Sequence, residues 1–150
     1  MSVIYVKKIE LSSIHKRYGL NISFNKTLNV LHGQNGTGKS TLLHIIANIA
    51  NCDFWRFAFI EFSSIKVLYS NGLSITLLQT ETEYGKEIKI QTDSGSDFSF
   101  SKKDAYEIVN LTEEDRNLRD FMHPLLSKMQ EFIKENNLRV IETSYFPAFR

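Results

Sequence analysis

The stretch of sequence that decides the fold is residues 33–41, which read Gly33-Gln34-Asn35-Gly36-Thr37-Gly38-Lys39-Ser40-Thr41. It matches the pattern G-x-x-x-x-G-K-[ST] of a phosphate-binding loop (P-loop). Glycines let consecutive backbone N–H groups turn towards phosphate oxygens without a Cβ atom in the way. Lys39 can carry its charge to the β- and γ-phosphates, and the Ser40 hydroxyl can bind Mg²⁺. These nine residues therefore predict a site for ATP and Mg²⁺.

The sequence around the loop supplies the setting that a P-loop needs. Residues 28–32 form a short strand-like run before it. After Lys39, apolar residues recur at helical spacing to about Ala50, at Leu42, Leu43, Ile45, Ile46 and Ile49. A helix in this place directs its free N–H groups and the positive end of its dipole at the phosphates. The strand–loop–helix order favours a true P-loop over a glycine-rich turn that only resembles one.

The segments before and after this helix are predicted to be mainly strands. Residues 3–11 and 20–24 are apolar at strand spacing. Residues 57–91 alternate apolar and polar positions, with Asn71-Gly72 as a hairpin turn and a second turn at 84–86. No helical pattern separates these runs, so they predict an antiparallel meander.

The last third of the chain is predicted to be largely helical. A polar stretch at 92–101 comes first, and Thr112 with Asp115 resembles a capping box. Pro124 is tolerable only near a helix start, and a helical apolar stripe follows it, at Leu125, Leu126, Met129, Phe132 and Ile133. Residues 138–141 are predicted to form a last short strand.

Composition indicates one globular unit. The chain has 150 residues, 18 basic and 17 acidic side chains and a net charge of +1, which gives no electrostatic argument for nucleic acid or an anionic membrane. Cys52 is the single cysteine, so we expect no internal disulfide and a small buried apolar residue at this position. The sequence shows neither a signal-peptide pattern nor an apolar run of membrane-spanning length, so we expect a cytoplasmic location.

Residues 31–43, Leu31-His32-Gly33-Gln34-Asn35-Gly36-Thr37-Gly38-Lys39-Ser40-Thr41-Leu42-Leu43, resemble the Walker A segment of ABC-type ATPases. They are most similar to the branch with RecF-like, SMC-like and bacterial AAA-family ATPases. The two strands predicted ahead of the loop also fit this branch. The final residues, 145–150, resemble a Tyr-Phe-Pro-Thr-Phe-Arg segment of some bacterial AAA-family ATPases, from which Ala148 departs. The resemblance is specific over about residues 1–60.

The resemblance implies roles for three residues between the first two strands. An aromatic residue ahead of Walker A stacks on adenine in many ABC proteins, and Tyr18 stands in that place. Packing beside the second strand is the alternative for Tyr18. Lys16 or Arg17 corresponds to a basic residue that reaches phosphate in SMC-like relatives, with a solvated loop charge as the alternative.

The aromatic residues that follow the predicted helix are expected in the core, at Phe54, Trp55, Phe57, Phe59 and Phe62.

The catalytic motifs of such ATPases have no convincing counterpart in this sequence. A Walker B motif needs four apolar residues and an acid; residues 57–61 match it but come too soon, so we interpret them as an ordinary strand ending in Glu61. Ile141-Glu142 matches less well. There is no Leu-Ser-Gly-Gly signature, because residues 93–96 read as a turn, and His123 beside Pro124 is interpreted as structural or exposed. The catalytic residues are therefore unassigned.

The predicted fold is α/β: the N-terminal lobe of a P-loop NTPase, with an antiparallel meander after the Walker A helix and an incomplete parallel sheet. We expect a single lobe over 1–150, with the strands, loop and helix in 1–56, the meander in 57–100 and the helical segment and tail in 101–150. The apparent lack of parallel strands beside residues 28–32 predicts marginal stability, self-association or a need for a partner.

Three functions remain open. The first is the N-terminal part of an ABC/AAA-type ATPase that binds ATP and Mg²⁺ but needs further elements for hydrolysis. The second is a complete small P-loop enzyme, against which the meander stands because such a fold needs alternating strands and helices. The third is a non-catalytic nucleotide-binding or interaction module. The expected partners are a nucleotide and the missing C-terminal half or a second copy.

Overall fold

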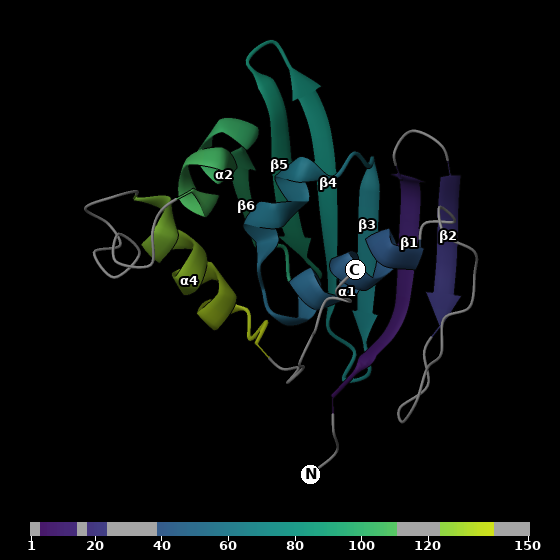
Figure 1. Cartoon of the computed structure of the whole chain (residues 1–150). Helices are drawn as coiled ribbons and strands as arrows, with labels where there is room; N and C mark the ends of the chain where they lie inside the picture. Colours follow the sequence, from purple (N-terminus) through teal and green to yellow (C-terminus); the bar gives the residue numbers. More distant parts are fainter. Residues whose placement is uncertain (1–3, 15–17, 24–38, 111–123, 140–150) are drawn as a thin grey trace.

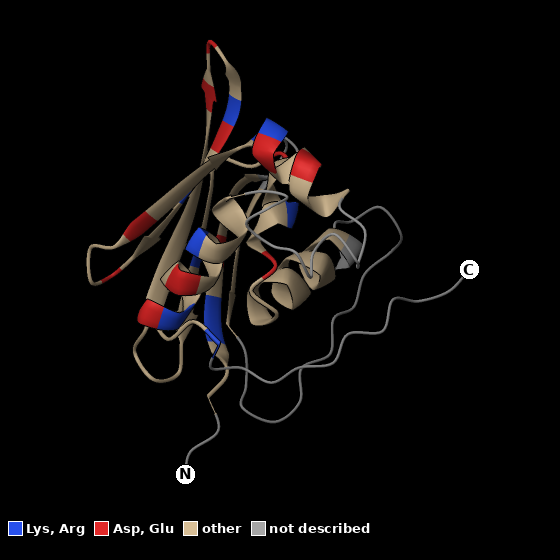
Figure 2. Ribbon diagram, turned by 90° about the vertical axis from the view of Figure 1, so that its left-hand side faces the viewer, with Lys and Arg blue, Asp and Glu red and all other residues tan. Residues whose placement is uncertain are grey.

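The computed structural model describes residues 4–14, 18–23, 39–110 and 124–139. Within these residues the protein has two layers (Figures 1 and 2), a twisted antiparallel sheet and a group of helices that covers one of its faces. The combination of helices and strands is the predicted α/β class, and the two layers enclose one hydrophobic core.

Six strands form the sheet. Their bounds are β1 Val6–Ile14, β2 Tyr18–Ser23, β3 Ser64–Tyr69, β4 Ser74–Thr82, β5 Gly85–Thr92 and β6 Asp97–Ser101. The strand order is β2-β1-β3-β4-β5-β6, and every neighbouring pair is antiparallel. The two strands predicted before the P-loop are therefore confirmed as β1 and β2, and they join the meander at β3.

Apolar and polar residues alternate along the strands because the helices cover only one face of the sheet. In the centre, Ile65 and Val67 of β3 are fully buried and pair with Leu77 and Ile75 of β4, which are also fully buried. Between them Lys66 points to the other face and is exposed. This period of two is the pattern of a half-buried antiparallel strand, and it fixes which face meets the helices.

Two hairpins of the meander close with the same turn geometry. The Gly72 amide donates to the Tyr69 carbonyl (3.1 Å), and the Gly95 amide donates to the Thr92 carbonyl (3.1 Å). Both glycines have positive φ, 91° and 96°, which glycine adopts without steric cost. The predicted turns at Asn71-Gly72 and at residues 93–96 are confirmed.

The helices lie on the buried face of the sheet. They are α1 Lys39–Ala50, the 3₁₀ helix η1 Phe54–Phe59, α2 Lys102–Val109 and α4 Leu125–Glu135. Aromatic contacts join this layer to the sheet: the Trp55 and Phe100 ring centroids are 4.8 Å apart, and those of Phe98 and Phe132 are 5.6 Å apart. The predicted covering of the sheet by the stripe of α4 is confirmed, with Met129, Phe132 and Ile133 buried.

The prediction of a strand at residues 57–60 is wrong. The segment 54–59 is the 3₁₀ helix η1, and the meander begins at Ser64. Phe54 and Phe57 are both fully buried, so the apolar spacing is three, which suits a 3₁₀ turn and not a strand. Phe59 is also not the core residue expected, because it is 44% exposed.

The polar stretch at 92–101 contains a strand that its composition concealed. Its second half is the edge strand β6, with Phe100 buried. A capping box then starts α2: the Asp104 amide donates to Ser101 Oγ (3.0 Å), and the Ser101 amide donates to Asp104 Oδ2 (3.1 Å). Leu138 and Arg139 are not in a strand, although Leu138 is buried.

Several predictions fall outside the described residues. These are the strand at 28–32, the capping box of Thr112 and Asp115, the strand residues 140–141 and the tail. The incomplete parallel sheet predicted around residues 28–32 is not seen among the described strands, whose pairings are all antiparallel. No helix in the described part of the chain is long and apolar enough to cross a membrane.

Candidate nucleotide-binding site

The predicted nucleotide site is described only from its helical end. Gly33, Gln34, Asn35, Gly36, Thr37 and Gly38 lie outside the described residues. Lys39 and Ser40 are the first two residues of α1, and their backbone is described but their side chains are not. Thr41 follows in the same turn and is partly buried. The described part of α1 therefore begins with the Lys-Ser pair, in the region where the pattern predicts a helix.

Burial of one face fixes α1 against the sheet. Leu42, Ile45 and Ile49 are 5%, 0% and 0% exposed and belong to the main core. The buried face of α1 is narrower than the predicted apolar face, because Leu43 is 39% exposed. The neighbouring His44 is exposed as well. The packed face sets the direction of the helix axis, and with it the place at which the first-turn N–H groups are presented.

The first turn of α1 fits an anionic ligand. It contains no acidic residue. A carboxylate there would occupy the positive end of the helix dipole and repel phosphate, whereas a turn that begins with a lysine and two hydroxyl residues does not. These described residues are thus chemically compatible with nucleotide phosphates and Mg²⁺.

The far end of α1 is closed by Cys52. The Asp53 amide donates to the Asn48 carbonyl (2.8 Å), and Cys52 has a positive φ of 55°, which reverses the chain after the last turn. The Cys52 thiol donates to the Leu138 carbonyl (3.3 Å). Burial raises the pKa of this thiol to about 11, against a smaller lowering effect of Arg139. Cys52 is buried as predicted, and such a thiol is a poor nucleophile.

A groove of about 770 Å³ runs beside α1. Its walls come from three elements: α1 contributes Thr41 and His44, η1 contributes Arg56 and Phe59, and α2 contributes Tyr106. Asp53 also lines it and holds Arg56 in an ion pair (Oδ2–Nε, 3.3 Å). No sequence pattern indicates this groove directly. The one related signal is the Ser101-x-x-Asp104 capping pattern, which marks the start of α2.

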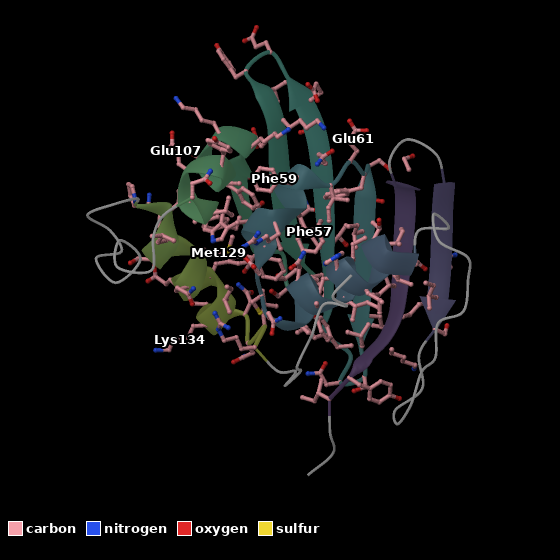
Figure 3. The ribbon with its side chains drawn as sticks, in the orientation of Figure 1. Phe57, Phe59, Glu61, Glu107, Met129 and Lys134 are labelled. Atoms are coloured by element: carbon pink, nitrogen blue, oxygen red, sulfur yellow. The ribbon has the colours of Figure 1, made fainter. Side chains whose placement is uncertain are left out.

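Glu61 is not arranged as a Walker B acid. The residues before it form η1 and not a strand, so the strand that carries such an acid is missing at this position. Its carboxylate pairs with the Lys86 ammonium (3.5 Å) across the β4–β5 hairpin. Figure 3 shows Glu61 near the upper end of β4, away from α1. Our interpretation of Glu61 as a non-catalytic residue agrees with this placement, although the strand assignment was wrong.

The other residues named from the sequence are only partly placed. Tyr18 is the first residue of β2, but its side chain is not described. Lys16, Arg17, His123 and Glu142 lie outside the described residues. Their proposed roles therefore stay predictions.

The loop pattern, the helix that follows it and the mixed α/β architecture define a P-loop domain. A family model described as "ATPase family associated with various cellular activities (AAA)" matches residues 29–148. This match covers most of the chain, and the chain belongs to the AAA family. It is a nucleotide-binding P-loop ATPase domain. No curated protein matches the chain significantly.

Proposed function

We propose that the protein binds ATP and Mg²⁺ through residues 33–41. The backbone N–H groups of the glycine-rich loop cradle the phosphates, Lys39 neutralises the β- and γ-phosphates, and the Ser40 hydroxyl is a ligand of Mg²⁺. Gln34, Asn35, Thr37 and Thr41 complete the loop. The observation that supports the proposal is that described α1 begins at Lys39, within the last residues of the phosphate-loop pattern, and has no acid in its first turn.

The finer assignment is to the ABC/AAA-type branch. It is supported by Asn35-Gly36 within the loop, by Ser-Thr-Leu-Leu after Lys39, and by two antiparallel strands ahead of the loop. We propose that the domain acts as the N-terminal part of such an ATPase. Hydrolysis then depends on acidic and signature elements supplied by a C-terminal half or a second copy, since Glu61 is engaged with Lys86.

Two other functions are separable from this one. A small nucleotide-kinase-like enzyme is disfavoured because the described sheet contains no parallel strand pair joined by a helix. A non-catalytic nucleotide-binding module agrees with the same described features. ATP turnover by the purified chain would favour the enzyme, whereas binding without turnover agrees with the partial ATPase or the module.

The direct test is a calorimetric titration with Mg²⁺–ATP. Lys39→Ala should weaken binding by on the order of 2–3 kcal/mol, because it removes a charge-assisted phosphate contact. Lys66→Ala is the matched control, since Lys66 is an exposed lysine on the opposite face of the sheet and should bind ATP like the wild type. Equal affinity of the wild type and Lys39→Ala would contradict the proposed site.

A further inference from the structure

The outer half of the β4–β5 hairpin projects from the body of the protein. We call residues 79–87 the arm (Figure 1). The β4–β5 ladder is continuous to its end, where Thr82 pairs with Gly85. At the tip, Tyr84 is 91% exposed, the highest value among the large apolar and aromatic side chains of the described residues. The arm therefore presents one aromatic ring to solvent, away from the core.

The tip is held in one conformation by its own hydrogen bonds. Thr82 Oγ1 donates to the Gly85 carbonyl (2.8 Å) and accepts from the Tyr84 amide (3.2 Å). Gly85 has a φ of 111°, a conformation that side chains with a Cβ rarely adopt. Because the backbone of the tip is preorganised, little backbone entropy is lost when the tip binds, and the exposed Tyr84 ring is well suited to be a central contact of an interface.

The arm is acidic at its tip. Glu81 and Glu83 closely precede Tyr84 and are exposed, and within the described part of the chain neither forms an ion pair. The arm's own cation, Lys86, lies opposite Glu81 in the β4–β5 ladder and forms its ion pair with Glu61. Figure 2 shows acidic residues along the outer part of this hairpin. The charge disfavours nucleic acid or an anionic membrane as the partner and favours a surface with basic residues.

The groove beside α1 has the complementary properties. Phe59 and Tyr106 line it and are 44% and 63% exposed. Arg56 lies in its wall but is paired with Asp53, which also lines the groove. The basic residues available to a partner are Lys102 and Lys103, which are exposed in the first turn of α2, one turn before Tyr106. Figure 3 shows Glu107 on the side of α2 that faces away from Phe59. The volume, about 770 Å³, is large enough to admit a tyrosine ring.

We propose that the arm of one copy of this chain docks in the groove of a second copy, with Tyr84 between Phe59 and Tyr106. Among the described residues, four large apolar or aromatic side chains are exposed: Leu43, Phe59, Tyr84 and Tyr106. One contact thus covers three of the four. Glu81 and Glu83 then approach Lys102 and Lys103, so shape and charge are satisfied together.

The contact is intermolecular because the arm is rigid. The ladder that reaches Thr82 and Gly85 keeps the tip beyond the body of its own chain in both views. The contact joins two different surfaces, the arm of one copy and the groove of the other. Each docked pair therefore leaves one arm and one groove unoccupied, and these can bind further copies or, in a reciprocal dimer, each other. The proposal does not depend on nucleotide, and its test uses nucleotide-free protein.

The test is sedimentation velocity of the full chain over a range of concentrations. We expect reversible self-association of the wild type that weakens as salt is raised. Tyr84→Ala and Tyr106→Ala should each raise the dissociation constant at least about tenfold, the usual effect of truncating a central aromatic contact. Leu43→Ala is the matched control, because it removes an exposed apolar side chain outside the groove, and it should associate like the wild type. Circular dichroism checks that each variant is folded.

Mixing the two variants gives the sharper result. Tyr84→Ala protein keeps an intact groove and Tyr106→Ala protein keeps an intact arm, so a mixture should form a 1:1 complex that neither variant forms alone. A wild type that stays monomeric at high concentration would overturn the proposal. So would association that survives Tyr84→Ala, or two variants that do not complement one another.

Discussion

The Cys52 thiol donates a hydrogen bond to the Leu138 carbonyl oxygen at 3.3 Å. It joins the end of the helix that follows the phosphate loop to the chain that leaves α4. Both residues are buried, at 6% and 1% exposure, so the contact lies in the core and not at the surface. The two halves of the family match are thus held together at this point by a residue whose chemistry is inert.

Cys52 should make the protein less stable at alkaline pH. Its pKa is about 11 in the folded chain and 9.0 in the reference state, so the unfolded chain loses this proton first. The contribution is present below pH 9 and is lost as the pH rises from 9 to 11. Urea unfolding between pH 8 and 10 should show a falling free energy of unfolding in the wild type.

Two variants of Cys52 isolate this effect. Cys52→Ser keeps a donor for the Leu138 carbonyl, and Cys52→Ala does not, but neither side chain titrates in this range. Both should therefore show a smaller decrease over the same pH interval. An unchanged slope in both variants would mean that another group controls the alkaline response.

Tyr69→Phe should stabilise the protein by about 1 kcal/mol, since it removes a desolvated hydroxyl that has no hydrogen-bond partner in the described part of the chain. Tyr69 is 1% exposed, and its hydroxyl forms no hydrogen bond to the described residues. Burial also raises its pKa, which reflects the same lack of solvation. Thermal and urea unfolding measure the change. Tyr84→Phe is the control, because the hydroxyl of Tyr84 is at an exposed position and its removal should not change stability. A loss of stability in Tyr69→Phe would contradict the prediction and indicate a buried hydrogen-bond partner such as an ordered water.

Gln79→Met should cost about 1 kcal/mol or more, because it leaves partly buried backbone groups without this partner. The Gln79 Nε2 group donates to the carbonyls of Ile60 (2.8 Å) and Phe57 (3.4 Å), and its Oε1 accepts from the Phe62 amide (3.4 Å). Gln79→Glu retains only the acceptor. Both variants should be less stable in urea than a Gln91→Met control, and equal stability of all three would contradict a structural role for the amide.

Glu61→Gln should leave the rate of ATP hydrolysis unchanged, and the rate itself should be very low. The Glu61–Lys86 ion pair is partly exposed, so its loss should cost less than about 1 kcal/mol. A phosphate-release assay on the wild type and on Glu61→Gln measures both points, with Lys86→Gln as the control for the ion pair. Activity that disappears only in Glu61→Gln would restore this residue as a catalytic acid.

The elements that could be predicted from the sequence are those in which the local residue pattern and the tertiary packing favour the same structure. Asn71-Gly72 and the alternating residues of β3 to β5 define turns and strands without reference to distant parts of the chain. The helix after Lys39 is also a local pattern, with a long apolar face. These features depend on the backbone preferences of single residues and on the spacing of apolar positions, and both can be identified directly in the sequence.

The failures arose where a pattern was short or where packing decided the outcome. Residues 54–59 are aromatic throughout except at Arg56 and Ala58, so they carry no clear period, and only burial of Phe54 and Phe57 shows the 3₁₀ turn. The groove could not be predicted, because it depends on how α2 is placed beside η1. The assignment of residues 33–41 to phosphate binding rests on the sequence pattern alone and stays a prediction.

The strand order also determines how this domain must fold. Strands β3 to β6 pair with their neighbours in sequence, so each step closes only a short loop. β1 must instead reach β3 across the long segment that contains the phosphate loop, α1 and η1, and this closure has a larger entropic cost. We therefore expect docking of the β1–β2 hairpin to limit the folding rate.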